Sequence, residues 1–178
     1  MSASGLEVFD KTLQTTNIWL DEIMADLGSD RHVAWKVLSV VLHKLRDRLP
    51  VESAAHLSAE LPMLIRGVYY DQYQPAKQPS RCRDMDQFCA EVQEWLSDTR
   101  PVDARAAVAS VFRVLSRHIP EGQIRKVHDT LPSDIRQAWH EIAADVAPPP
   151  DKGDRSHAAA GAPAGAAANT GDAQPAPR

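Results

Sequence analysis

The chain has 178 residues, enough for one ordinary domain or two very small ones, and 43% of them are hydrophobic, as in most globular proteins. Acidic residues outnumber basic ones by 24 to 20, whereas a general nucleic-acid binder carries an excess of Lys and Arg. No apolar run approaches the roughly 20 residues that span a bilayer, and the first residues lack the basic and apolar regions of a secretory signal. Two cysteines favour a reducing compartment. Together these features predict a cytoplasmic protein without a membrane segment.

The first predicted element is an amphipathic helix that ends at Gly28, a residue that commonly terminates helices. Its apolar face is expected to contain Phe9, Leu13, Leu20, Met24 and Leu27.

A second helix is predicted from about residue 33, because Ala34, Leu38, Val41 and Leu45 recur with helical spacing. Further valines make this helix apolar over much of its circumference, so we expect it to be central.

Prolines then mark the helix boundaries, because proline suits a helix start and disfavours helical conformation just before it. Pro50 is expected to open a short helix to about Glu60, and Pro62 another to about Tyr70. Residues 72–83 contain two prolines and three basic residues, and they are predicted to be an extended linker. A further amphipathic helix follows, with Met85, Phe88, Cys89, Val92, Trp95 and Leu96 on its apolar face.

Residues 33–70 align without a gap on residues 103–140, with eight identities. The identical positions are Ala34/Ala104, Val41/Val111, Leu45/Leu115, Pro50/Pro120, Leu61/Leu131, Pro62/Pro132, Ile65/Ile135 and Arg66/Arg136. They lie on the apolar stripe and at the prolines, which indicates a duplicated helical unit. We therefore predict an all-α fold in which two related repeats, residues 6–71 and 84–146, pack as a single bundle-like domain over 6–146.

Residues 147–178 contain 11 Ala, 6 Pro and 4 Gly, and no Val, Ile, Leu, Met or aromatic residue. Such a segment has nothing large to bury, so it cannot offset roughly 1–2 kcal/mol of ordering entropy per residue. We predict a disordered C-terminal tail.

Several short motifs occur in an order that resembles a bacterial family of proteins, the domain of unknown function 2267. They include Leu45-Arg-Asp-Arg-Leu-Pro50, Leu61-Pro62, Arg66-Gly67, Tyr69-Tyr70, Thr16-Asn17-Ile-Trp19-Leu20 and Trp139. The resemblance covers about residues 6–142 and implies an all-helical protein with two repeats. It supplies no catalytic or ligand residue.

No catalytic, cofactor or metal site is predicted. The seven histidines show no H-x-x-x-H or H-E-x-x-H spacing, and six residues separate Cys82 from Cys89, whereas structural zinc sites use two to four. Cys82 lies between two arginines, so an exposed and redox-reactive thiol is one interpretation and an ordinary exposed thiol the other.

The candidate binding residues are arginines and tyrosines. Arg66, Tyr70 and Tyr73 are expected to form a stripe that binds a protein partner, because Tyr and Arg are common in interface hot spots. Arg46 and Arg48 are added as basic neighbours.

Arg66 and Arg136 form a pair that the repeat keeps. The favoured interpretation is structural, in which Arg ties the last helix of a repeat to a carboxylate or to helix-end carbonyls, and the alternative is an anion site.

We expect a non-catalytic interaction or regulatory module with an unidentified protein partner, and a homo-oligomer is left open. Two alternatives remain. One is an enzyme or small-molecule binder with a pocket between the repeats, and the other, less favoured, is a nucleic-acid-associated protein that uses the Arg-rich segments.

Overall fold

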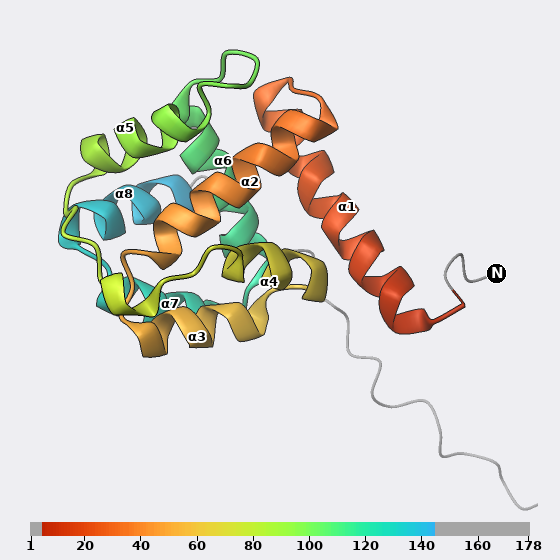
Figure 1. The fold of residues 1–178 in the computed structure, drawn as a ribbon, viewed down its shortest axis with the longest axis horizontal. Coiled ribbons are helices and arrows are strands. Elements are labelled where there is room, and N and C mark those ends of the chain that lie inside the picture. The colour runs from red at the N-terminus through yellow and green to blue at the C-terminus, as the bar shows by residue number, and fades with distance from the viewer. Residues whose placement is uncertain (1–4, 145–178) are drawn as a thin grey trace, which may run out of the picture.

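The computed structural model describes residues 5–144, and over that range the chain is all-helical, as predicted (Figure 1). Its elements are α1 (Glu7–Leu27), α2 (Arg31–Arg46), α3 (Val51–Glu60), α4 (Met63–Tyr70), the short 3-10 helix η1 (Pro75–Lys77), α5 (Met85–Trp95), α6 (Ala104–His118), α7 (Glu121–Thr130) and α8 (Ser133–Ala144). The predicted tail at 147–178 lies outside the described residues. None of the described helices combines the length and the apolar character needed to cross a bilayer.

The helix boundaries fall where the sequence places them. Pro50, Pro62 and Pro120 occupy the position just before α3, α4 and α7, and their φ angles lie between -53° and -55°. Gly28 ends α1 with a φ of 58°, in the left-handed region that glycine tolerates best. An aspartate caps α2, α5 and α6; the side chain of Asp30, for example, accepts a hydrogen bond of 2.9 Å from the amide of Val33.

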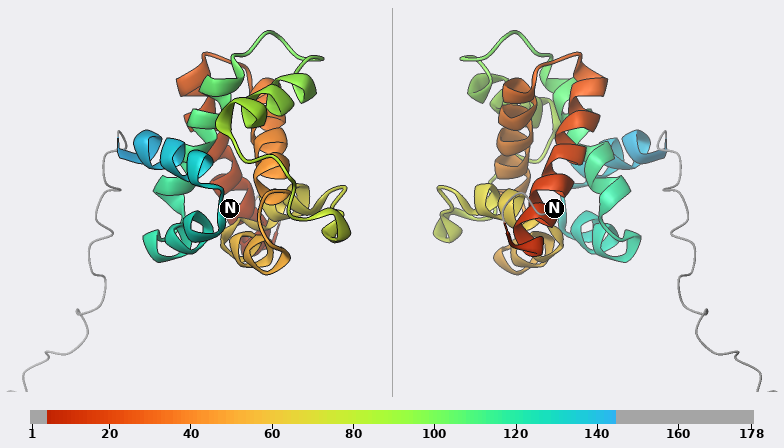
Figure 2. Two further views of the ribbon diagram at one scale, coloured as in Figure 1. Left: turned by 90° about the vertical axis from the view of Figure 1, so that its left-hand side faces the viewer. Right: turned by 90° about the vertical axis from the view of Figure 1, so that its right-hand side faces the viewer.

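One hydrophobic core joins all eight helices. The long helices α2 and α6 pack against each other at its centre, α1 lies along both of them, and α5 and α8 cover the other side (Figures 1 and 2). The short helices α3 and α7 pack together at one end. The central position that was expected for the helix containing Leu45, which is α2, is therefore confirmed.

Positions that are 70 residues apart take equivalent places in this core. Leu45 and Leu115 are both fully buried, as are Tyr69 and Trp139. Helices α2, α3 and α4 are followed in the same order by α6, α7 and α8; the first two pairs have similar lengths, and α8 is four residues longer than α4. The duplication itself stays a prediction, and this correspondence is what supports it.

Four expectations from the sequence are wrong in detail. Phe9 and Leu13 of α1 are 44% and 47% exposed, and Trp95 of α5 is 43% exposed, so each lies outside the core. Cys82, expected to be an exposed thiol, is 2% exposed, because the segment around it folds back onto the core. Residues 72–83 are extended only in part, since they contain the helical turn Pro75–Lys77.

Candidate functional site

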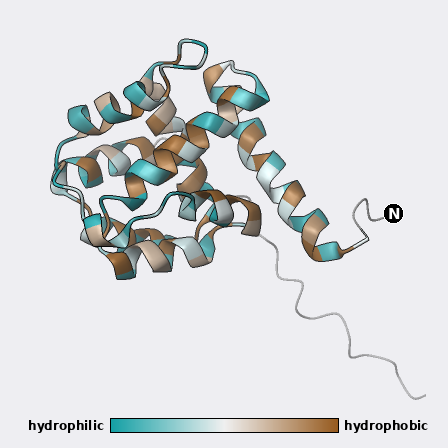
Figure 3. Cartoon of the chain, viewed as in Figure 1, coloured by the Kyte–Doolittle hydropathy of each residue, from teal (hydrophilic) through white to brown (hydrophobic). Residues whose placement is uncertain are grey.

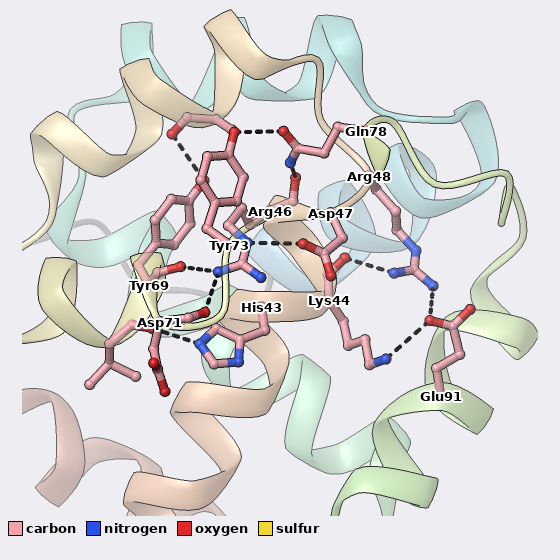
Figure 4. A network of polar contacts seen from close by, with 12 residues as sticks. His43, Lys44, Arg46, Asp47, Arg48, Tyr69, Asp71, Tyr73, Gln78 and Glu91 are labelled. Atoms are coloured by element: carbon pink, nitrogen blue, oxygen red, sulfur yellow. Dashed lines mark hydrogen bonds and ion pairs between the residues drawn. The ribbon is translucent and has the colours of Figure 1, made fainter. Parts of the chain in front are cut away.

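Arg46, at the end of α2, is the centre of a buried polar network (Figure 4). Only 3% of the residue is exposed. Its guanidinium donates hydrogen bonds to the carbonyl oxygens of Tyr69 and Asp71, the latter at 2.9 Å, and to the carboxylate of Asp47, also at 2.9 Å. Its carbon lies 5.0 Å from the centre of the Tyr73 ring. Arg46 thus supplies a positive charge to the carbonyl end of α4, where it is favourable.

The same network fixes the segment that follows α4. The side-chain amide of Gln78 donates to the carbonyl oxygen of Arg46 and accepts a hydrogen bond of 2.6 Å from the Tyr73 hydroxyl. The amide of Ser80 donates to the carbonyl oxygen of Asp47 at 2.7 Å. The connection between the two halves of the chain is therefore held to α2 by side-chain and backbone bonds.

Arg48 and Lys44 link α2 to α5 through one carboxylate. The Arg48 guanidinium lies 3.1 Å from a carboxylate oxygen of Glu91, and the Lys44 ammonium lies 3.5 Å from the same oxygen. Arg48 also donates to the carbonyl of Lys44 at 2.7 Å and stacks over the ring of Phe88 at 4.4 Å. The Lys44 ammonium lies 4.6 Å from the centre of the Trp95 ring. Arg48 is 2% exposed, so its charged group makes its contacts inside the protein, between α2 and α5.

A groove with a volume of about 440 Å³ lies between the end of α2, the 72–83 segment and α5. It is lined by His43, Lys44, Arg46, Asp47, Gln72, Gln74, Lys77, Gln78, Ser80, Glu91 and Trp95. Most of its charges pair with each other, and Lys77 makes no ion pair with another described residue. In the described part of the chain no cluster of three side chains could hold a metal ion.

His43 borders this groove and is held in one tautomer. Its Nε2 lies 2.6 Å from the carbonyl oxygen of Val68 and must donate to it, which leaves Nδ1 as an acceptor. Burial lowers the pKa of His43 below its usual value, and the hydrogen bond to Val68 opposes that effect in part. The ring is therefore neutral at pH 7. A neutral acceptor, three amide-bearing side chains and an exposed indole suit recognition of a polar ligand.

Arg66 fastens α4 to the end of α3. Its guanidinium donates to the carbonyl oxygens of Ser58, Ala59 and Leu61, at 2.8, 2.9 and 3.0 Å. These are helix-end carbonyls, which is the contact that the structural interpretation names. Arg136 is half-buried, and its side chain has no hydrogen bond or ion pair with another described residue. The two arginines that align in the repeat thus have different surroundings.

Tyr70 and Tyr73 lie close together but have different environments. The Tyr70 hydroxyl is 2.7 Å from the Ser58 hydroxyl, and 38% of the residue is exposed. Tyr73 is half-buried under Arg46, and its ring centre lies 5.5 Å from that of Tyr70. The structure thus separates the five candidate residues, with Arg66 and Tyr70 on the surface, Tyr73 at its edge, and Arg46 and Arg48 in the interior.

A second surface feature was not singled out by the sequence patterns. Ten large hydrophobic residues of the described chain are exposed, and eight of them belong to α1, the residue before it, or α4. Five of these lie in the first two turns of α1, at the residue before it, or at the start of α4, and we call them the α1–α4 patch: Leu6, Phe9, Leu13, Met63 and Leu64. A hydrogen bond of 3.1 Å from the amide of Leu64 to the Thr12 hydroxyl holds the start of α4 against α1. Figure 3 shows the apolar residues on this part of α1.

His128, in α7, is a buried histidine. The sequence spacing addressed the histidines only as possible metal ligands. His128 is 4% exposed, its ring centre lies 4.7 Å from that of Trp139 and 4.4 Å from that of His140, and its Nε2 has no hydrogen-bond partner among the described residues. Burial, followed by the charge of His140, lowers the pKa of His128 to about 4. The residue aligned with His128 in the repeat, Ser58, is also buried and polar, but its burial is visible only in the structure.

The chain matches a known protein family. The model of a family described as an uncharacterized conserved protein, DUF2267, matches residues 16–138, which include every helix from α2 to α7, more than half of α1 and half of α8. No curated protein matches the chain. The match spans more than half of the 178 residues. The chain therefore belongs to the DUF2267 family.

Proposed function

We propose that the protein is a non-catalytic interaction module of the bacterial cytoplasm that binds a protein through the α1–α4 patch. The observation that carries the proposal is the concentration of exposed apolar side chains on α1 and α4. Large hydrophobic residues that are exposed singly are normal, whereas a contiguous apolar patch of several hundred Å² often marks an interaction site. Both cysteines are free thiols, which fits a reducing compartment.

Tyr70 extends the proposed surface along α4. Its hydroxyl is bound to Ser58, which fixes the orientation of the ring, and its exposed face can still contact a partner. Arg66 lies one turn earlier on the same helix and is exposed, although its donors are used by α3. We keep these two residues as part of the proposed interface, at its edge.

The test compares two double variants with matched losses of apolar surface. Leu13→Ser with Leu64→Ser removes two patch residues that are 47% and 40% exposed. Ile18→Ser with Val51→Ser removes two residues that are 43% and 47% exposed and lie outside the patch. Each tagged protein is used to capture partners from the native host, and the captured proteins are quantified by mass spectrometry. A partner that is lost with the patch variant and kept with the control supports the proposal.

The proposal fails if the patch variant captures the same proteins as the wild type. Circular dichroism and thermal melts of both variants show whether either has lost its fold. Since all four residues are exposed by 40% or more, we expect both variants to melt within a few degrees of the wild type.

A second candidate function is the binding of a small polar molecule in the 440 Å³ groove, which lies between the two predicted repeats. A ligand that binds only the native state raises the melting temperature, so a thermal-shift screen tests this function directly. A compound whose shift is abolished by Trp95→Ala and retained by the Leu13→Ser, Leu64→Ser variant would place it in the groove. Binding of nucleic acid is not proposed, because the burial of Arg46 and Arg48 removes two cations from the basic surface that it requires.

A further inference from the structure

The apolar stripe of α1 is only half covered by the rest of the molecule. Residues along it recur at alternating spacings of three and four, the pattern of a helix that packs lengthwise against another helix. The stripe consists of Leu6, Phe9, Leu13, Thr16, Leu20, Ile23 and Leu27. Thr16, Leu20 and Ile23 are between 0% and 5% exposed, whereas Leu6, Phe9 and Leu13 are between 44% and 53% exposed. One continuous stripe thus enters the core at Thr16 and is bare before it.

The bare part corresponds to additional helix length. In the predicted second repeat the first helix is α5, which has 11 residues, whereas α1 has 21. The apolar face of α5 is buried from its first residue to Val92, with Met85, Phe88 and Val92 each 5% exposed or less, and only Trp95 at its end is exposed. The N-terminal half of α1 reaches beyond the other helices (Figure 1). The core is therefore complete without the first two turns of α1.

The C-terminal segment has little to cover these turns with. Residues 145–178 contain one valine and no Leu, Ile, Met or aromatic residue. They cannot supply the large side chains that fill the spaces between the residues of a helical stripe. This segment therefore does not account for the missing apolar surface.

The area of the patch matches one half of a dimer interface. The five residues of the α1–α4 patch are between 40% and 53% exposed. At about 200 Å² for a large side chain that is fully exposed, they present about 470 Å² of apolar surface. A stable interface buries roughly 800 Å² per partner, of which roughly 56–65% is apolar, or about 450–520 Å².

We propose that the occupant of the α1–α4 patch is a second copy of this chain, bound through a two-fold symmetric contact between the N-terminal halves of two α1 helices. This deepens the proposed function, on which it rests, by naming the partner. In a two-fold contact the same surface is buried on both copies, so a single bare stripe on each chain satisfies the other. Because this end of α1 extends past the other helices and the start of α4 lies against it, two such helices can lie side by side with Met63 and Leu64 of each copy at the contact.

The experiment is sedimentation-velocity ultracentrifugation of the full chain, together with light scattering, over a dilution series at micromolar concentrations. We expect a particle of twice the 19.6 kDa chain mass that dissociates on dilution. Phe9→Ser with Leu13→Ser is expected to shift the protein to a monomer. The matched control is Val8→Ser with Ile18→Ser, which are 50% and 43% exposed on the same helix but lie off the stripe, and it should remain a dimer.

A wild-type protein that is monomeric throughout the series overturns the proposal, as does a dimer that survives in the stripe variant or is lost equally in the control. The milder variant Phe9→Ala provides the same comparison if the double variant melts early. The two proposals fail separately. A monomer whose patch variant loses a captured protein refutes only the second copy, and a monomer whose patch variant captures the same proteins as the wild type refutes both.

Discussion

Replacing Arg46 by Met should lower the free energy of unfolding by several kcal/mol, more than is usual for an arginine at the end of a helix. The methionine keeps much of the volume of the side chain but removes the donors to the carbonyl oxygens of Tyr69 and Asp71 and to the Asp47 carboxylate. A hydrogen bond to a charged group contributes about 1.5–3 kcal/mol, and the bond to Asp47 counts for less because 40% of that side chain is exposed. Relief of the desolvation of the guanidinium offsets part of the loss. We therefore expect a cost of about 2–5 kcal/mol, the sum for the two bonds to carbonyl oxygens less this relief.

Urea denaturation measured by circular dichroism gives this cost, and hydrogen exchange locates it. The amide of Ser80, which donates to Asp47, should exchange faster in the variant, because the 72–83 segment is held to α2 by this network. Arg46→Lys is expected to recover less than half of the loss, since an ammonium cannot reproduce the fork of the guanidinium. Arg83→Met provides the control, because Arg83 is exposed and makes no ion pair with another described residue. A cost below about 1 kcal/mol for Arg46→Met, with unchanged exchange, would refute the structural role assigned to Arg46.

Three further predictions concern stability. Leu45→Ala and Leu115→Ala should each cost about 2–5 kcal/mol in denaturant melts, because both side chains are fully buried, and a neutral result for either would count against their equivalence in the repeat. The pKa of His128 is about 4 in the folded protein and about 6.5 in the unfolded chain, so only the unfolded state gains a proton as the pH falls between these values. The free energy of unfolding should therefore fall by about 2 kcal/mol from pH 7 to pH 5. The variant His128→Leu should remove that part of the pH dependence. Deletion of residues 147–178 should leave the melting temperature almost unchanged, because the segment has no large apolar side chain; a fall of more than a few degrees would contradict this.

The helix boundaries were predictable because their causes are local. Pro50, Pro62 and Pro120 restrict their own φ and the conformation of the residue before them, whatever the rest of the fold does. Gly28 ends α1 for an equally local reason, its positive φ. The central place of the helix around Leu45 followed from the width of its apolar surface, which only a buried helix can carry.

The errors arose where the answer depends on distant parts of the chain. Periodicity shows which face of α1 is apolar, but it cannot show whether another helix reaches Phe9 and Leu13. Arg46 and Arg48 were expected at the binding surface as basic neighbours of the tyrosine stripe, and only the fold brings the carbonyl oxygen of Asp71 and the carboxylate of Glu91 close enough to compensate their charges. The burial of these arginines depends on the tertiary structure, so no short sequence motif predicts it.

The residues that differ between the two predicted repeats also show where function is to be sought. Tyr69 and Trp139 occupy aligned positions and are both fully buried, yet the Tyr69 hydroxyl donates to the carbonyl of Ala54 in α3, whereas the Trp139 indole donates to the Ser116 hydroxyl in α6. A buried polar tip needs a partner, and each copy has found its own within the same apolar framework. The buried aromatic residue of each half is thus satisfied by a different hydrogen-bond partner. The exposed stripe around Phe9 has no such explanation within the fold, because a helix as short as α5 would lack these residues altogether. A helix that extends ten residues further than its counterpart and keeps an apolar stripe in solvent is best explained by a contact with another molecule.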